Sequence, residues 1–173
     1  MSKQILNIDE LEYMDLGHGD RFAARMGPIS RKIGARGLGY NLTVVPAGKR
    51  AFPFHSHRVN DEMFFIIEGS GEIRIGKKTH PIRQGDVIAC PPGGPETAHQ
   101  IINNSDSDIR YLAVSTSMSP EVAEYPDSDK YGVIIELDEN ENGVPKMWRL
   151  MMKAESTKVG YWEGEDELKG STN

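Results

Sequence analysis

Short apolar runs, separated by turn-forming residues, fill the middle of the chain. Residues 40–45 are rich in β-forming residues and end at Pro46, and residues 62–68 are apolar and end at Gly69. Further runs of this kind cover residues 72–75, 87–90, 99–102 and 109–115. Many short strands at this spacing, with little helical periodicity, predict an all-β barrel or sandwich.

The two ends of the chain show a weaker pattern. Residues 1–39 hold a short acidic segment compatible with a helix and then a glycine-rich basic stretch, and residues 117–130 have the composition of a loop. Beyond them we predict strands at 131–137, 148–152 and 159–162, before an acidic, frayed tail at 163–173. We therefore expect an N-terminal arm (1–39), a β-barrel core (40–116) and a C-terminal extension (117–173) that packs on the barrel.

Composition and charge exclude several classes of protein. The 173 residues, 38% of them hydrophobic, suffice for one soluble domain with its own core. A net charge of -6 argues against nucleic acid as a partner, because phosphate binding needs a basic face. The single cysteine, Cys90, fits a reducing compartment, and no segment resembles a secretory signal or a membrane span. We expect a cytoplasmic protein with no membrane partner.

Four residues carry the candidate chemistry: His55, His57, Glu62 and His99. On an extended strand, His55 and His57 point to the same face, because the side-chain period is two. Glu62 begins the next apolar run, and His99 begins a later one. Three imidazoles and one carboxylate suit a divalent transition metal such as Mn, Fe, Co, Ni, Cu or Zn. We predict that these four residues bind one such ion.

The spacing of these residues resembles the two motifs of the cupin superfamily. The first motif corresponds to Gly48, His55-Ser56-His57, Glu62 and Gly69, with a Gly48–His55 gap that is one residue longer than in the family motif. The second corresponds to Gly85, Pro91-Pro92-Gly93, His99 and Asn103, with an insertion of about three residues at 94–96. The local sequence around both motifs is similar to that of small bacterial single-domain cupins, some of which are described as sugar-phosphate isomerases. The resemblance implies a double-stranded β-helix (jelly-roll) barrel with a metal near its axis.

The expected environment of the metal suits chemistry better than a structural role. Strand parity places Phe64 and Ile66 on the same face as Glu62, and Ile101 on the same face as His99. An apolar interior strengthens the attraction between metal and ligands. Four protein ligands leave about two positions of an octahedron open, whereas structural zinc sites are closed.

Other residues have simpler interpretations. We expect His80 to be exposed at a turn, His18 to lie in a loop, and Cys90 to be a buried, inert thiol. The basic residues Arg31, Lys32 and Arg36 are interpreted as a solvated stretch, and Lys49, Arg50 and Arg58 as solvated or as holding an anionic substrate. A turn or hydrogen-bonding role fits Asn103 better than ligation.

Three functions remain open at this point. The first, which we favour, is a metal-dependent enzyme acting on a small polar or anionic molecule, either a sugar-phosphate isomerase or an Fe(II) dioxygenase. The second is a module that binds or senses such a ligand without turnover. The third is a barrel that its metal only stabilises, with an apolar face used for assembly. The apolar segments beyond residue 131 predict a homodimer.

Overall fold

The computed structural model describes residues 4–139, 145–153, 155, 158–163 and 165, whose regular secondary structure is mainly β-strand. The strands are β1 (Met14–His18), β2 (Phe22–Pro28), β3 (Leu38–Val45), β4 (Ser56–His57), β5 (Glu62–Glu68), β6 (Ser70–Ile75), β7 (Lys78–Arg83), β8 (Val87–Cys90), β9 (His99–Ile102), β10 (Ile109–Thr116), β11 (Glu121–Tyr125), β12 (Lys130–Glu139) and β13 (Pro145–Lys153). Three short 3₁₀-helices accompany them, η1 (Ile8–Glu10), η2 (Ser30–Ile33) and η3 (Pro126–Ser128). Within the described residues, no helix has the length and apolar character needed to cross a membrane.

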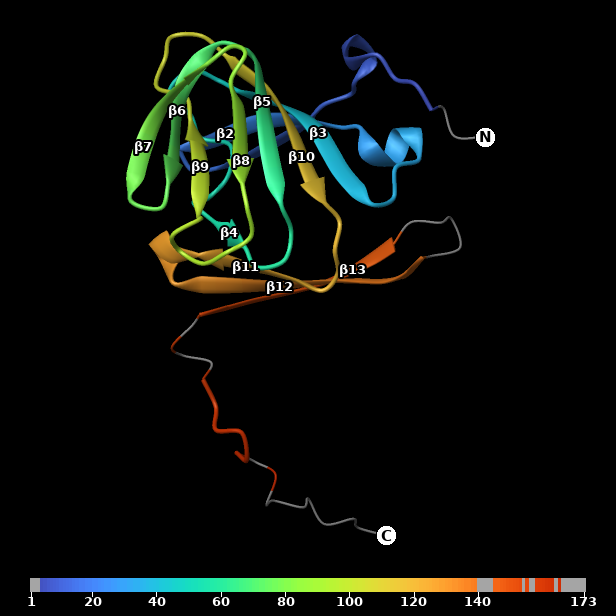
Figure 1. Ribbon diagram of the computed structural model, residues 1–173, viewed down its shortest axis with the longest axis vertical. Coiled ribbons are helices and arrows are strands. Elements are labelled where there is room, and N and C mark those ends of the chain that lie inside the picture. The colour runs from blue at the N-terminus through green and yellow to red at the C-terminus, as the bar shows by residue number, and fades with distance from the viewer. Residues whose placement is uncertain (1–3, 140–144, 154, 156–157, 164, 166–173) are drawn as a thin grey trace.

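Two antiparallel sheets form the walls of a barrel (Figure 1). The larger has the strand order β1-β2-β3-β10-β5-β8, and the smaller has the order β7-β6-β9. Phe64 and Ile66 of β5 meet Ile73 of β6 and Ile101 of β9 in one buried apolar cluster. The alternation of each strand thus places one face of each sheet in a common core. The predicted all-β, double-stranded β-helix fold is confirmed.

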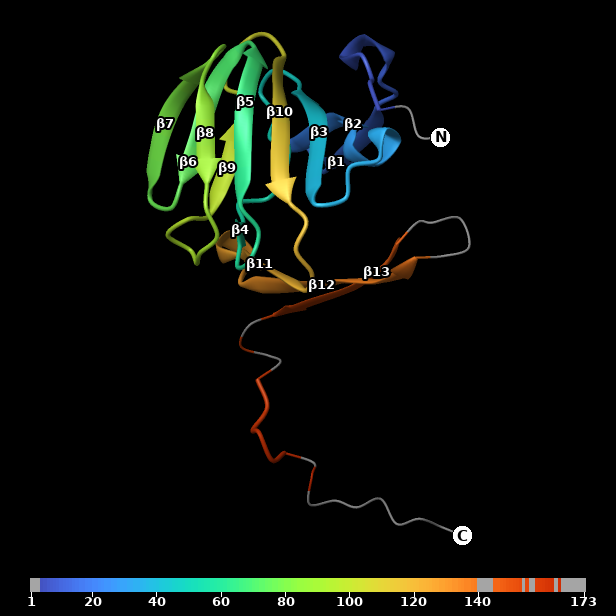
Figure 2. The ribbon, with the colours of Figure 1, turned by 45° about the vertical axis from the view of Figure 1, so that its right-hand side comes forward.

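A third sheet lies across one end of the barrel, as Figures 1 and 2 both show. Its strand order is β13-β12-β11-β4. The two-residue strand β4 pairs with β11, so that His57 lies opposite Ala123 and Ser56 opposite Glu124. The C-terminal extension therefore reaches the segment that carries the two closely spaced histidines.

Several predicted strands agree closely with the structure, and the acidic segment near the N-terminus contains the short 3₁₀-helix η1. The predictions for 62–68, 87–90 and 99–102 coincide with β5, β8 and β9. Residues 14–28 form the β1–β2 hairpin, whose turn contains Gly19 at a φ of 55°. Leu11 and Ile29, on either side of this hairpin, are buried against Leu42 of β3, so the N-terminal residues cover the outer face of the larger sheet. The division into an arm, a core and an extension stays a prediction.

Two predictions beyond the barrel core are wrong. Residues 117–130 are not only a loop, because they contain β11 and η3. Two buried residues of β11 are the carboxylates Glu121 and Glu124, so this strand lacks the alternation of polar and apolar residues that would predict it. Residues 158–160 are irregular and residues 161–163 form a turn, so the strand predicted at 159–162 is absent. The strands predicted at 131–137 and 148–152 are present within β12 and β13. Most of the predicted frayed tail, residues 163–173, lies outside the described residues.

Candidate metal centre

The four predicted ligand residues come from three segments that meet at one end of the barrel. His57 lies in β4 with His55 just before it, Glu62 begins β5, and His99 begins β9. The backbones of His55 and His99 bind each other directly, since each N–H donates to the other carbonyl, at 3.2 and 2.8 Å. This bridge brings residues 44 positions apart side by side.

Donor atoms of His55, Glu62 and His99 converge closely enough to hold a metal ion. One ligand atom from each residue lies within 4.8 Å of the other two. His99 Nε2 lies 2.9 Å from Glu62 Oε2, and His57 Nε2 lies 3.5 Å from the same oxygen. The structure therefore brings all four residues together, with His57 beside the tighter group of three. That they ligate a metal stays a prediction.

Hydrogen bonds orient two of the imidazole rings. His55 Nδ1 lies 2.8 Å from the carbonyl of Pro53, and His99 Nδ1 lies 3.3 Å from the carbonyl of Thr97. A carbonyl can only accept, so the Nδ1 of His55 carries the proton and its Nε2 offers a lone pair, whereas His99 also faces the Glu62 carboxylate through its Nε2. A ring held through one nitrogen and open at the other is the usual arrangement of a metal-ligating histidine.

His57 provides the test of whether a metal fits. Both of its ring nitrogens are buried, and neither has a hydrogen-bond partner among the described residues. Its Nδ1 lies 3.5 Å from Glu121 Oε2, so the ring is placed between two carboxylates, Glu62 and Glu121. Buried polar atoms are normally paired. An imidazole nitrogen without a partner, facing a buried carboxylate, suits a cation between them.

The charge states also suit a cation. Burial and the neighbouring His99 lower the pKa of His55 to about 4, so this ring is neutral near pH 7. Burial opposes ionisation of Glu62, but His57 and His99 outweigh it and hold the pKa of that carboxyl well below its usual range. Burial also lowers the pKa of His57, but the Glu62 and Glu121 carboxylates outweigh it and raise this pKa above its ordinary value. His55 thus offers a neutral nitrogen and Glu62 an anionic oxygen, whereas His57 must give up a proton before it can bind a divalent metal.

Sequence reasoning missed Glu121, because residues 117–130 were interpreted as a loop. Its carboxylate is 5% exposed and accepts the backbone N–H groups of Arg58, Val59, Asn60 and Val122, together with the side-chain amide of Asn60. A charged group is stable in such a buried position only when donors surround it in this way. The one available signal was a glutamate immediately after the Ser119-Pro120 pair, which is too common to be specific.

Aromatic rings enclose the histidines. The rings of His55 and Tyr125 are stacked, with centroids 6.0 Å apart, and His99 meets the edge of Phe64 at 5.5 Å. The inward position of Phe64 was predicted from the alternation of side chains along its strand. The position of Tyr125 was not predicted, because it belongs to β11, which the sequence did not indicate as a strand. These rings shield the donors from bulk water, which strengthens electrostatic interactions between them.

The other histidines, Cys90 and Asn103 have surroundings that agree with the non-ligand roles expected from the sequence. His80 and His18 are exposed, although His18 ends β1 instead of lying in a loop. Cys90 is buried, and burial with the nearby Glu62 raises its pKa to about 12. Asn103 is buried and donates to the carbonyls of Val45 and Ser107, as its hydrogen-bonding role predicts. Arg58 forms an ion pair with Glu124 and is therefore not simply solvated.

Comparison with known proteins agrees with this geometry. The cupin domain family model matches residues 41–115, which contain all four ligand candidates. Residues 41–115 are a cupin domain. The match begins in β3 and ends in β10, so the cupin domain contains the central barrel strands but not β1, β2 or β11–β13.

Solved structures show the same fold beyond the cupin domain. A sugar phosphate isomerase of the cupin superfamily from Silicibacter pomeroyi superposes with a TM-score of 0.71 and 22% identity, covering 91% of this chain and 97% of that one. A predicted oxalate decarboxylase from Thermotoga maritima gives a TM-score of 0.55 and 21% identity, covering 66% and 99%. At such identities these likenesses show the fold alone.

Curated proteins also match part of this chain, among them one from an archaeon. The chain is 29% identical over 72 residues to an uncharacterized protein of Methanocaldococcus jannaschii, a match that covers 42% of this chain and 54% of that protein. The chain thus spans about half the length of that relative.

Proposed function

We propose that this protein is a metal-dependent enzyme that interconverts isomers of a small sugar phosphate. The observation that carries the proposal is the convergence of His55, Glu62 and His99, whose donor atoms lie within 4.8 Å of one another beside His57. The likeness to a sugar phosphate isomerase over 91% of the chain supports this choice among the reactions of cupins. A bound divalent metal supplies a Lewis acid that polarises adjacent carbonyl and hydroxyl oxygens of a sugar.

A cavity beside His57 matches such a substrate. It has a volume of about 240 Å³, and both His57 and Glu121 lie in its wall. Hydroxyl and amide groups form much of the remaining wall, from Asn60, Ser115, Thr116, Ser117 and Ser119. Such groups form hydrogen bonds with the hydroxyls of a sugar.

Arg31 adds the charge that a phosphate needs. It lies in the same wall, although its sequence context suggested only a solvated basic stretch. A guanidinium binds phosphate oxygens in a bidentate manner. In the proposed function, Arg31 binds the phosphate and the hydroxyl residues orient the sugar toward His57. The wall also includes the apolar side chains of Met118, Ile134 and Met147, so it is the hydroxyl groups and Arg31 that favour the isomerase over the dioxygenase.

Turnover of sugar phosphates by metal-loaded protein tests the proposal. Purified protein loaded separately with Mn, Zn or Fe would be mixed with a panel of aldose and ketose phosphates, and their interconversion followed by NMR. We expect isomerisation of at least one pair. Binding without turnover would support the sensing module instead, oxygen consumption with iron would support the dioxygenase, and neither binding nor turnover would contradict the proposal.

The variant Arg31→Ala separates substrate binding from metal binding. We expect it to raise KM at least tenfold while the metal content stays unchanged. Arg31 lines the cavity but forms no hydrogen bond or ion pair with the four ligand candidates among the described residues. The matched control is Arg36→Ala, which removes an exposed arginine of the same basic stretch that does not line the cavity. Equal kinetics in both variants would remove the assigned role of Arg31.

A further inference from the structure

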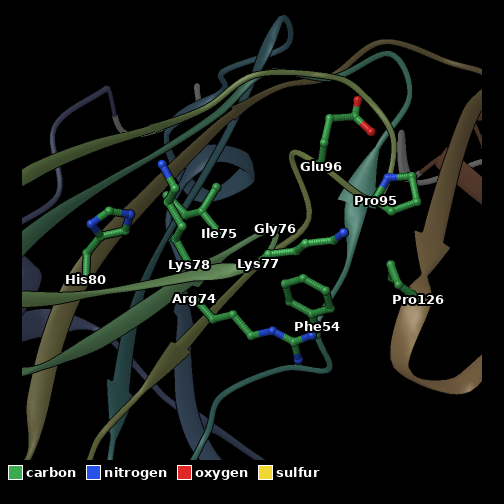
Figure 3. A pocket seen from close by; sticks show the side chains of 10 residues that line it. All are labelled: Phe54, Arg74, Ile75, Gly76, Lys77, Lys78, His80, Pro95, Glu96 and Pro126. Atoms are coloured by element: carbon green, nitrogen blue, oxygen red, sulfur yellow. The ribbon is translucent and has the colours of Figure 1, made fainter.

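A second and larger cavity lies away from the metal centre. It has a volume of about 720 Å³ and lies between the β6–β7 turn, the loop before β9 and the first residue of η3 (Figure 3). None of the four ligand candidates lines it. Pro95 and Glu96, from the insertion that departs from the second cupin motif, form part of one wall. The volume falls within the usual range of small-molecule sites.

The walls of this cavity are fixed by direct contacts. A Cβ atom at Gly76 would lie 2.6 Å from the carbonyl oxygen of Glu96, and Gly76 has a φ of 54°. The Gly76 N–H donates to the carbonyl of Ala98 at 2.8 Å. Only glycine permits this close approach, so the β6–β7 turn packs directly on the inserted loop.

The inserted loop is also closed on itself. Both the backbone N–H and the hydroxyl of Thr97 donate to the carbonyl of Gly94, at 3.1 Å in each case. The Gly93 N–H donates to the carbonyl of His57 at 2.8 Å. The cavity is therefore preformed, which lowers the entropic cost of binding a ligand.

The floor of the cavity is apolar. Phe54, Ile75, Pro95 and Pro126 contribute to it. The Arg74 guanidinium carbon lies 3.6 Å from the centroid of the Phe54 ring, and the same group forms hydrogen bonds of 3.0 and 2.8 Å with Asp127. Asp127 thus neutralises Arg74, which acts as a fixed part of the wall.

Positive charge at the cavity comes from two adjacent lysines. Lys77 and Lys78 are exposed, and neither forms an ion pair or a side-chain hydrogen bond with another described residue. Figure 3 shows the Lys77 ammonium extending between Phe54 and Pro95 toward Pro126. Glu96 also lines the cavity, but it is one negative charge and its carboxylate accepts the Gly94 N–H at 2.8 Å, so the two lysines leave a local excess of positive charge. An anion is the complementary ligand.

We propose that this cavity binds a small amphipathic organic anion. Its apolar ring or chain lies against Phe54, Pro95 and Pro126, and its carboxylate or phosphate is held by Lys77, with Lys78 at the rim. The site is separate from the metal centre and from the cavity beside His57, so it binds its ligand whether or not metal is present.

Titration of the full-length protein with phenyl phosphate, followed by ¹⁵N–¹H NMR, tests this proposal. We expect shifts of the Gly76, Lys77, Glu96 and Thr97 amides, tighter binding of phenyl phosphate than of inorganic phosphate, and the same affinity in chelator-treated and metal-loaded protein. The last result separates this site from the metal centre, because it does not depend on the proposed enzyme.

Substitution of the exposed lysine completes the test. Lys77→Ser should weaken phenyl phosphate binding about fivefold, as expected for one partly screened charge contact. The control Lys146→Ser removes an exposed lysine of β13 and should leave the affinity unchanged. Shifts confined to other amides, equal binding of both phosphates, or equal weakening by both variants would overturn the proposal.

Discussion

Glu121 Oε2 lies 3.5 Å from Nδ1 of His57, across the pairing of β11 with β4. Four backbone N–H groups and the Asn60 amide fix the carboxylate, so it cannot turn away from the ring. A carboxylate on one imidazole nitrogen fixes the tautomer and directs the other nitrogen toward its ligand. Glu121 faces His57 Nδ1 while Nε2 faces Glu62, so a strand outside the cupin domain places a second carboxylate beside the candidate metal centre.

Glu121→Gln should weaken metal binding without removing it. We expect a loss of about 10- to 100-fold in metal affinity, as is typical for a partner of a ligating histidine. The unfolding free energy should fall by about 2 kcal/mol, since charge-assisted hydrogen bonds to buried N–H groups are lost. Isothermal titration with metal and urea denaturation measure the two effects.

A second carboxylate on β11 provides the matched control. Among the described residues, the Glu124 carboxylate accepts hydrogen bonds from Arg58 and Tyr131 and forms none with the four ligand candidates. Glu124→Gln should therefore lower stability while leaving the metal affinity unchanged. If both variants weakened metal binding equally, the effect would come from the sheet and not from the His57–Glu121 contact.

Metal removal should lower the melting temperature but leave the barrel folded. A ligand that binds only the folded state, at about 100 times its dissociation constant, stabilises it by roughly 2.7 kcal/mol. The barrel keeps its own apolar cluster, which includes Phe64, Ile66, Ile73 and Ile101. Thermal unfolding with and without a chelator, followed by circular dichroism, measures the shift. A chain that lost its β-structure on chelation would show that the metal is structural.

Cys90 should resist alkylation in the folded protein. Its thiol is 2% exposed, and burial with the nearby Glu62 raises its pKa from 9.0 to about 12, so almost no thiolate forms at pH 8. Iodoacetamide followed by mass spectrometry should modify it only after unfolding in urea. Because the raised pKa favours the protonated folded state, this contribution to stability is constant below pH 9 and declines as pH rises toward 12. Rapid labelling of the native protein would contradict the burial.

The C-terminal sheet predicts a homodimer. β13 is an edge strand, and Trp148, Leu150 and Met151 on it are 44%, 42% and 51% exposed. An apolar edge strand that is open on both faces tends to pair with another chain. Light scattering should give twice the chain mass, and Leu150→Lys should shift the protein toward monomer, whereas Ile5→Lys, which changes an exposed apolar residue before β1, should not. A monomer mass over a wide concentration range would refute this assembly.

The barrel could be predicted from the sequence because its strands obey simple alternation between clear turns. Glu62 begins a strand whose inward positions, Phe64 and Ile66, are apolar, so both the strand and its orientation follow from the pattern. The candidate ligands could be predicted because each lies beside such a strand. Residue identity and spacing were sufficient there.

The remaining parts depend on contacts between distant segments. β11 buries Glu121 and Glu124 through hydrogen bonds with residues about 60 positions earlier, which no local hydrophobic pattern reveals. Arg31 belongs to a basic stretch in the sequence and reaches the His57 cavity only through the fold. Residues 159–162 have the composition of a strand, but no neighbouring strand is placed beside them. The secondary structure of such segments depends on tertiary contacts, which override their local propensity.

The metal content of three histidine variants tests the central claim most directly. His57→Ala, His99→Ala and His80→Ala would be purified in parallel and analysed by inductively coupled plasma mass spectrometry. His57 and His99 face Glu62 in the metal centre, whereas His80 is exposed on β7. We predict that the first two variants lose most of the metal and that His80→Ala retains the wild-type amount. Equal metal content in all three proteins would contradict the assignment of this centre.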